Sequence, residues 1–257
     1  MKKEVRNLLI ALMVFMLMAT VLLKIVDYQA DGRVSTLSLR EVVPPSDDVL
    51  FMVEGSTYAR YLRSSVGIHY DGKDWNLPKI AEVYQYLDRG SNLNNVYSPD
   101  DAHLSRSYRD YNRDILNDLG VLDSTDCLQL PDNITDRVRD LSYRITSGMP
   151  TPFEKAKAIE EFLQVRCDYR MDYEPAPPGH EPNDWFLCET REGICGNFNS
   201  AFVILARASG IPARLSAGYY LLPGNGAPQP VYPSQAHAWA EVGFEGLGWL
   251  AFEAVPP

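Results

Sequence analysis

The sequence predicts an α+β fold in which helices come first and antiparallel strands follow. Between residues 131 and 210, apolar residues recur at the spacing of buried helix faces. The stretches 213–222, 236–242 and 249–253 instead have the short apolar or alternating pattern of strands. Glycine-containing turns separate these strands, which favours antiparallel neighbours over crossover connections.

Length and charge limit the classes of function that fit the chain. With 257 residues it can form one large or two small domains. The net charge is −10, and no basic stripe is present that could neutralise phosphates. We therefore expect no nucleic-acid partner, and nothing in the composition fixes the oligomeric state.

The N-terminus predicts a membrane anchor. Residues 1–7 are basic, and the apolar run 8–26 is about long enough to span a bilayer. Asp27 and Asp31 follow the run, so residues 1–7 are predicted to be cytoplasmic and the remainder extracytoplasmic. A cleaved signal peptide is the alternative, and it also exports the domain. Residues 27–45 are then predicted to form a polar tether.

Residues 46–130 are predicted to form an extracytoplasmic region rich in strands and irregular structure. Val49–Val53 has the pattern of a buried strand, and Asp71-Gly72 is typical of a hairpin turn. One helix is possible near residues 108–119. His69 has no catalytic partner nearby in the sequence, so we expect a surface or strand histidine.

The core region, residues 131–257, starts with two predicted helices. The first has an apolar face and ends at Gly148; its apolar residues are Ile134, Val138, Leu141 and Ile145. The second starts at a capping box, Thr151-Pro152-Phe153-Glu154, and buries Ala156, Ile159, Phe162 and Leu163. The Pro- and Gly-rich loop 174–183 is expected to line the approach to a site. Asn133-Ile134-Thr135 is a glycosylation sequon, but Asn133 also fits as a helix N-cap.

The third predicted helix begins at Cys195 and ends at Gly210. Its apolar residues are Phe198, Ala201, Phe202, Leu205 and Ala208. A cysteine at a helix N-terminus lies at the positive end of the helix dipole, which favours the nucleophilic thiolate. The alternative is a small buried residue at a helix start.

His237 and Glu253 are equally distant in sequence from Glu245, at the start of a turn with two glycines. If the flanking strands form a hairpin, both side chains lie on one face and within a few positions of being opposite; opposite pairs have Cβ atoms ~5 Å apart. A carboxylate beside an imidazole orients it, and an imidazole that reaches Cys195 gives a thiolate–imidazolium pair. Taken singly, a structural strand histidine and a solubilising glutamate are the alternatives.

Several segments resemble the transglutaminase-like superfamily core, over residues 131–257. They are Gly193-Ile194-Cys195, residues 206–214, Gly218-Tyr219, residues 236–242 and residues 248–253. Residues 61–63 and 70–75 resemble the extracytoplasmic segment that precedes this core in prokaryotic membrane-bound members. The resemblance implies a papain-like α+β fold with Cys195 as nucleophile, His237 as general base and acid, and Glu253 as the orienting acid. Most of the superfamily has aspartate at the third position.

The reaction that the resemblance implies is acyl transfer from a protein or peptide amide to an amine or to water. The backbone N–H of Cys195 is the natural oxyanion donor, and Asn197 and Trp185 are candidates for the second. No metal-binding or nucleotide-binding motif is present, so we expect no cofactor. The alternatives are a non-catalytic surface module that binds peptide or cell-envelope material, and a structural domain of a membrane assembly.

The remaining cysteines are Cys127, Cys167 and Cys188. In an oxidising compartment one disulfide among them is plausible, with Cys167–Cys188 as the first choice. Free buried thiols are the alternative.

Overall fold

The structure, a computed structural model, describes residues 34–38, 48–80, 83 and 96–257. Its contacts divide the chain into two units, Met1–Ser35 and Thr36–Pro257. The first strand, β1 (Val34–Ser38), lies across this division. All other described residues belong to the second unit.

None of the helices in the described ranges has both the length and the apolar character that a membrane span needs. The anchor predicted at residues 8–26, the basic segment 1–7 and most of the predicted tether 27–45 lie outside the described residues. They remain predictions.

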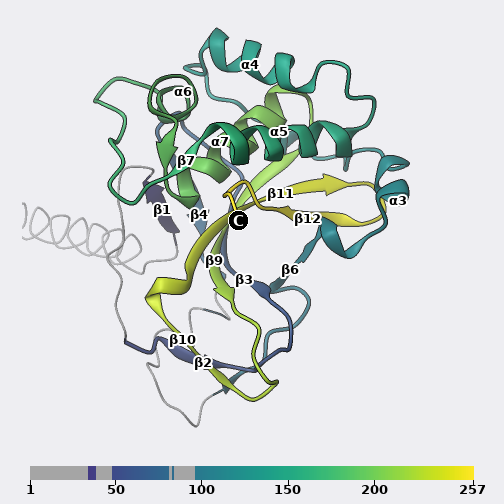
Figure 1. Ribbon diagram of the computed structural model, residues 1–257, viewed down its shortest axis with the longest axis vertical. Coiled ribbons are helices and arrows are strands. Elements are labelled where there is room, and N and C mark those ends of the chain that lie inside the picture. Colours follow the sequence, from purple (N-terminus) through teal and green to yellow (C-terminus); the bar gives the residue numbers. More distant parts are fainter. Residues whose placement is uncertain (1–33, 39–47, 81–82, 84–95) are drawn as a thin grey trace, which may run out of the picture. The chain divides into compact units, whose positions relative to one another are not determined.

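Five strands of the second unit form a closed barrel in the order β11-β12-β6-β3-β9. All neighbours are antiparallel except β12 and β6, which are parallel. The strands are β3 (Arg60–Gly67), β6 (Leu104–Ser107), β9 (Ala213–Leu221), β11 (Ala236–Phe244) and β12 (Gly248–Phe252) (Figure 1). The three strands predicted in the C-terminal region are confirmed.

The predicted regions 46–130 and 131–257 both contribute strands to the closed sheet. The strands β3 and β6 come from the 46–130 region, yet they complete the closed sheet with the C-terminal strands. Contact between β3 and β9 is close at Gly218, where an added Cβ would lie 1.9 Å from the Leu62 carbonyl oxygen. The glycine that the family resemblance includes therefore joins the two regions.

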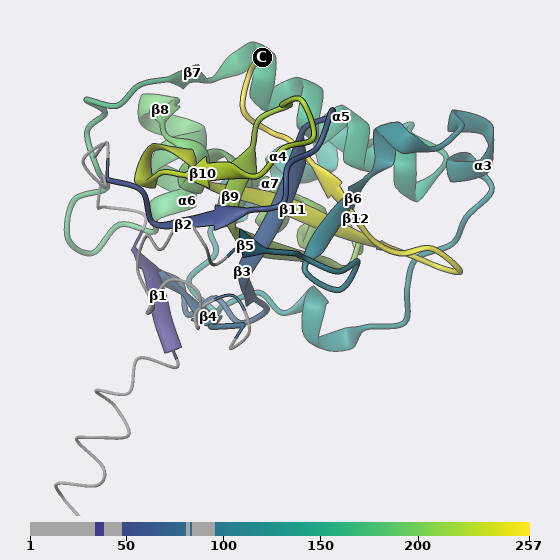
Figure 2. The ribbon, with the colours of Figure 1, turned by 90° about the horizontal axis from the view of Figure 1, so that it is seen from below.

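A smaller sheet has the order β10-β2-β5, formed by β2 (Phe51–Val53), β5 (Val96–Tyr97) and β10 (Gln229–Val231). The strands β2 and β10 lie side by side (Figure 2). The predicted strand at 49–53 is confirmed over three residues. The predicted turn at Asp71-Gly72 is also present: Tyr70 bridges Trp75, Gly72 has φ +92°, and β4 (Asp74–Pro78) follows.

The α-helices between residues 96 and 257 are α3 (Arg113–Asn117), α4 (Asp136–Thr146), α5 (Pro152–Arg166), α6 (Pro182–Trp185) and α7 (Cys195–Ala208). The long helices α4 and α5 pack against α7, and α7 packs against β11 (Figure 1). A 3-10 turn, Tyr108–Asp110, precedes α3, so the helix predicted over 108–119 is divided into two short pieces. A π-helical turn, Phe186–Thr190, follows α6.

The start of α5 confirms one prediction, and the start of α4 corrects another. The α5 helix begins as predicted, because the Thr151 side chain accepts a hydrogen bond from the Glu154 N–H and Pro152 is the first helical residue. The α4 helix is capped by Thr135 and not by Asn133. The Asn133 amide instead donates to the Gly72 carbonyl at 3.0 Å, so its cap interpretation is wrong.

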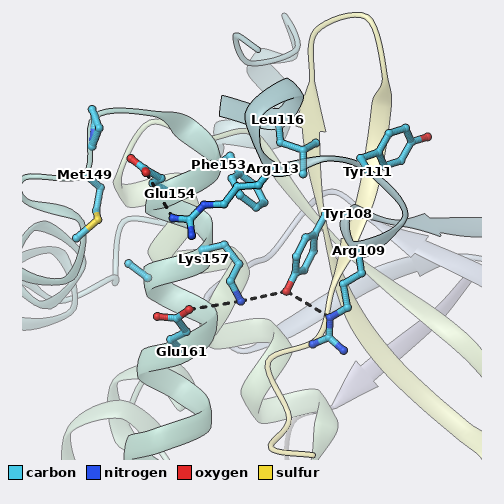
Figure 3. A pocket seen from close by; sticks show the side chains of 12 residues that line it. Tyr108, Arg109, Tyr111, Arg113, Leu116, Met149, Phe153, Glu154, Lys157 and Glu161 are labelled. Atoms are coloured by element: carbon cyan, nitrogen blue, oxygen red, sulfur yellow. Dashed lines mark hydrogen bonds and ion pairs between the residues drawn. The ribbon is translucent and has the colours of Figure 1, made fainter. Parts of the chain in front are cut away.

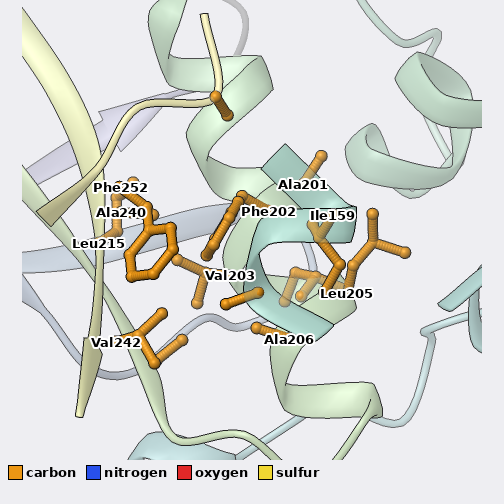
Figure 4. Close-up of a cluster of buried hydrophobic side chains, with 14 of the residues drawn as sticks. Ile159, Ala201, Phe202, Val203, Leu205, Ala206, Leu215, Ala240, Val242 and Phe252 are labelled. Atoms are coloured by element: carbon orange, nitrogen blue, oxygen red, sulfur yellow. The ribbon is translucent and has the colours of Figure 1, made fainter. Parts of the chain in front are cut away.

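The main core lies between the helices and the closed sheet. Figure 4 shows Phe202 of α7 on the side of Leu215, Val242 and Phe252 of the strands, and Ile159 of α5 beside Ala201 and Leu205 of α7. All seven are at most 2% exposed, and burial of each side chain larger than alanine contributes about 1.5–3 kcal/mol. The α7 helix is buried on nearly every side, and it is held on the closed sheet by its packing against β11 and by the contact of Phe202 with Phe252 of β12.

All four cysteines are free. The Cys167–Cys188 disulfide is therefore not formed. Cys167 is buried at the end of α5, and burial raises the pKa of its thiol to about 12. This thiol is expected to be unreactive.

Candidate active site

Cys195 is the first residue of α7 and is half-buried. The backbone before it is held by Asn197, whose side-chain oxygen accepts a hydrogen bond from the Ile194 N–H at 3.0 Å. This position places the sulfur at the positive end of the helix dipole, as the sequence predicts.

His237 lies on β11 beside Cys195 and Glu253. Its Nε2 is 2.6 Å from Oε2 of Glu253. Burial alone would lower the pKa of His237, but hydrogen bonds to Cys195 and Glu253, together with their negative charge, raise it to about 10. The imidazole is thus held in its protonated form between an acid and a thiol.

The hairpin register explains why Glu253 reaches His237. Ala240 pairs with Phe252, the last residue of β12, and Glu253 is the next residue. Extending this register would place His237 opposite Val255, so Glu253 is two positions away and points to the same face. The structure therefore brings together Cys195, His237 and Glu253, the three predicted site residues.

Four hydrogen bonds hold the Glu253 carboxylate. Oε2 accepts from the Tyr61 hydroxyl at 3.2 Å as well as contacting His237. Oε1 accepts from the Asn199 side chain at 3.2 Å and from the Val255 N–H at 3.1 Å. Burial, with the nearby charge of Glu253, raises the pKa of Tyr61, so its hydroxyl remains a donor.

The backbone of Glu253 is also held. Its N–H donates to Oε1 of Glu160, a fully buried residue of α5, at 3.0 Å. The other Glu160 oxygen accepts from the Tyr108 hydroxyl at 2.8 Å and from Lys157. A cavity of about 480 Å³ lies between the Tyr108–Asp110 turn and α5. Figure 3 shows Tyr108 and Lys157 on its wall. None of Cys195, His237 or Glu253 lines this cavity.

Aromatic rings surround His237. Tyr61 and Trp239 stack on it at centroid distances of 6.2 and 6.4 Å, and Tyr220 lies 6.0 Å away. The Trp239 indole is buried and donates to the Ser105 hydroxyl at 3.0 Å. These rings restrict the orientation of the imidazole and the access of water to it.

The two candidates for a second oxyanion donor have other hydrogen-bond partners. Asn197 bonds to the Ile194 N–H and the Tyr173 hydroxyl. The Trp185 indole donates to the Glu174 carbonyl at 3.3 Å. The Cys195 backbone N–H, the first predicted oxyanion donor, itself donates to the Tyr169 hydroxyl, so a substrate carbonyl oxygen would have to replace this hydroxyl there. Within the described residues, no group of three or more His, Cys, Asp or Glu side chains is arranged to hold a metal ion.

Sequence reasoning missed Tyr61, Asn199 and Glu160. Tyr61 and Glu253 are 192 residues apart, and no local pattern links them. Asn199 lies on a helix face that is apolar elsewhere, and a polar residue at such a buried position is the one signal that could have identified it.

The fold and the three grouped side chains define an α+β domain with a cysteine–histidine–glutamate site. Residues 139–254 match the model of the Transglutaminase-like superfamily. This part of the chain is similar to that superfamily, and it contains all three site residues but not Tyr61.

Two curated proteins are each similar to about half of the chain. The uncharacterized protein YebA of Bacillus subtilis (strain 168) is 40% identical over 134 residues, which are 49% of this chain and 18% of YebA. A protein-glutamine gamma-glutamyltransferase of Pseudomonas aeruginosa is 33% identical over 137 residues, which are 49% of this chain and 19% of that protein. The match thus spans less than a fifth of either relative.

The periplasmic domain of TgpA from Pseudomonas aeruginosa, in its crystal structure with ethylmercury, has a similar fold. The TM-score is 0.52 at 19% sequence identity, over 85% of this chain and 88% of that domain. The similarity extends well beyond the 139–254 match and therefore includes strands from the 46–130 region. It supports the fold as a whole.

Proposed function

We propose that this protein is a membrane-anchored, extracytoplasmic acyltransferase that uses Cys195, His237 and Glu253 to act on amide groups of proteins or peptides. The observation that carries the proposal is the contact series from the thiol at the start of α7 through His237 to Glu253. A buried imidazole with a pKa of about 10, between a thiol and a carboxylate, is the arrangement that nucleophilic cysteine catalysis needs.

The reaction has two steps. The Cys195 thiolate attacks the amide carbon, and a carbon–sulfur bond forms while the carbonyl oxygen becomes an oxyanion near the Cys195 N–H. Collapse of this intermediate breaks the carbon–nitrogen bond, and His237 gives its proton to the departing amine. In the second step an amine or water attacks the thioester, His237 accepts its proton, and the thiolate leaves.

Two similarities support particular parts of the proposal. The Pseudomonas aeruginosa relative is a protein-glutamine gamma-glutamyltransferase, which favours glutamine carboxamide as the acyl donor here. The structurally similar TgpA domain is periplasmic, which agrees with the extracytoplasmic location that the N-terminal charge pattern predicts.

The test uses the 257-residue chain with a glutamine-containing peptide and hydroxylamine as acceptor amine. We expect release of ammonia together with a peptide hydroxamate. Without hydroxylamine, ammonia release with glutamate formation would indicate water as the acceptor. If neither ammonia release nor peptide cleavage exceeds the Cys195→Ala background, the non-catalytic surface module becomes the better interpretation.

A Tyr61→Phe variant tests whether the N-terminal region contributes to the site. Loss of the hydroxyl removes one of four hydrogen bonds to the Glu253 carboxylate. We expect kcat for ammonia release to fall about tenfold with little change in KM, since a hydrogen bond to a charged group contributes about 1.5–3 kcal/mol. Tyr220→Phe is the matched control, because Tyr220 contacts His237 through its ring. Equal effects of the two substitutions would contradict this role of Tyr61.

A further inference from the structure

Asn199 is a fully buried residue one turn after Cys195 on α7. Its side-chain nitrogen donates toward three oxygens: Oε1 of Glu253 at 3.2 Å, the Ala238 carbonyl at 2.8 Å and the Cys195 carbonyl at 3.2 Å. An amide has two N–H groups, so one of them is shared. One side chain thus contacts Glu253, the helix turn of Cys195 and the strand of His237.

The side-chain oxygen of Asn199 is used as well. It accepts hydrogen bonds from the N–H groups of Ala240 and Ala254, both at 3.2 Å. The ladder between β11 and β12 ends at the pair Ala240–Phe252. Beyond that pair, the β11 segment and the segment after Phe252 are connected through the Asn199 amide. This amide bonds to Ala238 and Ala240 of β11 and to Ala254 of the other segment.

This connection through Asn199 has a direct consequence for the site. Glu253 lies between Phe252, the last paired residue, and Ala254, which Asn199 holds. The backbone on both sides of Glu253 is therefore fixed, and the same amide that fixes it also bonds to the carboxylate.

We infer that Asn199 is a positioning residue that holds the Glu253 carboxylate and the first turn of α7 in fixed relation to β11, so that Glu253, His237 and Cys195 remain in contact. The inference rests on the proposed function and assigns no contact with substrate to Asn199. Asparagine is the residue type that meets these needs, because it supplies two donors and an acceptor from one short side chain. Aspartate would bring a second carboxylate to Oε1 of Glu253, and alanine would leave buried backbone groups unpaired.

The experiment compares Asn199→Ala and Asn199→Asp with wild type and with Ser200→Ala. Ser200 is the matched control: it is the next residue on α7, is equally buried, and accepts a hydrogen bond from the Trp75 indole at 2.8 Å. Ser200→Ala also removes a buried hydrogen bond from α7 but leaves the contacts of Glu253 intact. The readout is the rate of Cys195 alkylation by iodoacetamide as a function of pH, followed by ammonia release from a glutamine peptide.

The expected result separates positioning from stability. We expect the alkylation rate at pH 6 to fall about tenfold or more in Asn199→Ala and to change less than about twofold in Ser200→Ala. Only the first variant removes a hydrogen bond that holds Glu253 beside the His237 imidazolium. In Asn199→Asp, two carboxyl groups at hydrogen-bond distance hinder each other's ionisation. The acidic limb of its activity profile should therefore move to higher pH, even if Asn199→Ala does not fold.

The outcomes distinguish this inference from the proposed function. If wild type keeps its reactivity at low pH and both Asn199 variants do too, the positioning role is wrong while the proposed function stands. Equal losses in Asn199→Ala and Ser200→Ala would also overturn it. If wild-type Cys195 itself reacts as an ordinary thiol, the proposed function fails first.

Discussion

Replacing Cys195 by alanine is expected to lower the rate of ammonia release from glutamine peptides by about 10⁴-fold or more, because the covalent thioester route is then closed. Cys195→Ser should be nearly as inactive, since a hydroxyl is far less acidic than a thiol and does not form the ion pair with His237. The measurement is initial-rate ammonia release, with the unfolding midpoint recorded for each variant.

Cys188→Ala is the matched control for this prediction. Cys188 is also half-buried, but burial and nearby Asp184 raise the pKa of its thiol. We expect its replacement to leave the rate within about twofold of wild type, because Cys188 contacts none of Cys195, His237 and Glu253 through any hydrogen bond or ion pair described above. Substantial activity in Cys195→Ala, or loss of activity in Cys188→Ala, would show that the nucleophile has been assigned to the wrong residue.

The second large effect concerns Glu241, a fully buried carboxylate on β11. It accepts from Arg214 Nε at 2.7 Å, is 3.3 Å from Arg63 Nη1, and contacts the Ser105 hydroxyl. Glu241→Gln should lower the free energy of unfolding by about 3–5 kcal/mol, because two partly buried guanidinium groups lose their charge partner. Urea denaturation at neutral pH measures this loss.

The same residue predicts a pH dependence of stability. Burial alone would raise the pKa of Glu241, but Arg214 and Arg63 lower it below its usual 4.5. A group whose pKa is lower in the folded chain stabilises the fold above its unfolded pKa and loses this contribution as the pH falls through the folded value. Wild type should therefore lose stability on acidification more steeply than Glu241→Gln. Glu245→Gln, on the exposed turn of the same hairpin, should match wild type in both measurements; if it does not, the effect is not specific to Glu241.

The main features of the site could be predicted from the sequence because they depend on local patterns. Helical spacing after Cys195 placed the thiol at a helix start, and the turn after Glu245 placed His237 and Glu253 on one face of a hairpin. The register found in the structure differs from exact opposition by two positions, which leaves the face unchanged.

The surroundings of the site could not be predicted, because they depend on contacts between distant segments. Tyr61 reaches Glu253 only because β3 pairs with β9, next to the strand of His237. For the predicted oxyanion donors the reason is different, because residue type does not show whether a polar group is already hydrogen-bonded. Asn197 and Trp185 are donor residue types that precede or follow Cys195 in the sequence, but the Asn197 amide donates to the Tyr173 hydroxyl and the Trp185 indole to the Glu174 carbonyl.

These contacts also give the 46–130 region a part in the site. It supplies Tyr61, which bonds to Glu253, and Tyr108, which bonds to the Glu160 that holds the Glu253 backbone. Both residues lie outside the 139–254 family match. The catalytic residues of the proposed enzyme thus come from the matched core, and part of their support comes from the strands and turns before it.

The most direct test of this account is the rate of iodoacetamide alkylation at Cys195 as a function of pH, in the 257-residue chain and in His237→Asn. Mass spectrometry of the digested protein identifies the labelled cysteine. Because the pKa of His237 is raised to about 10, the imidazolium should persist beside the thiol across neutral pH. We expect a wild-type rate that stays nearly constant between about pH 6 and 9, and a steep rise with pH in His237→Asn. A wild-type rate that rises only near pH ~8.5, as for an ordinary thiol, would contradict this account.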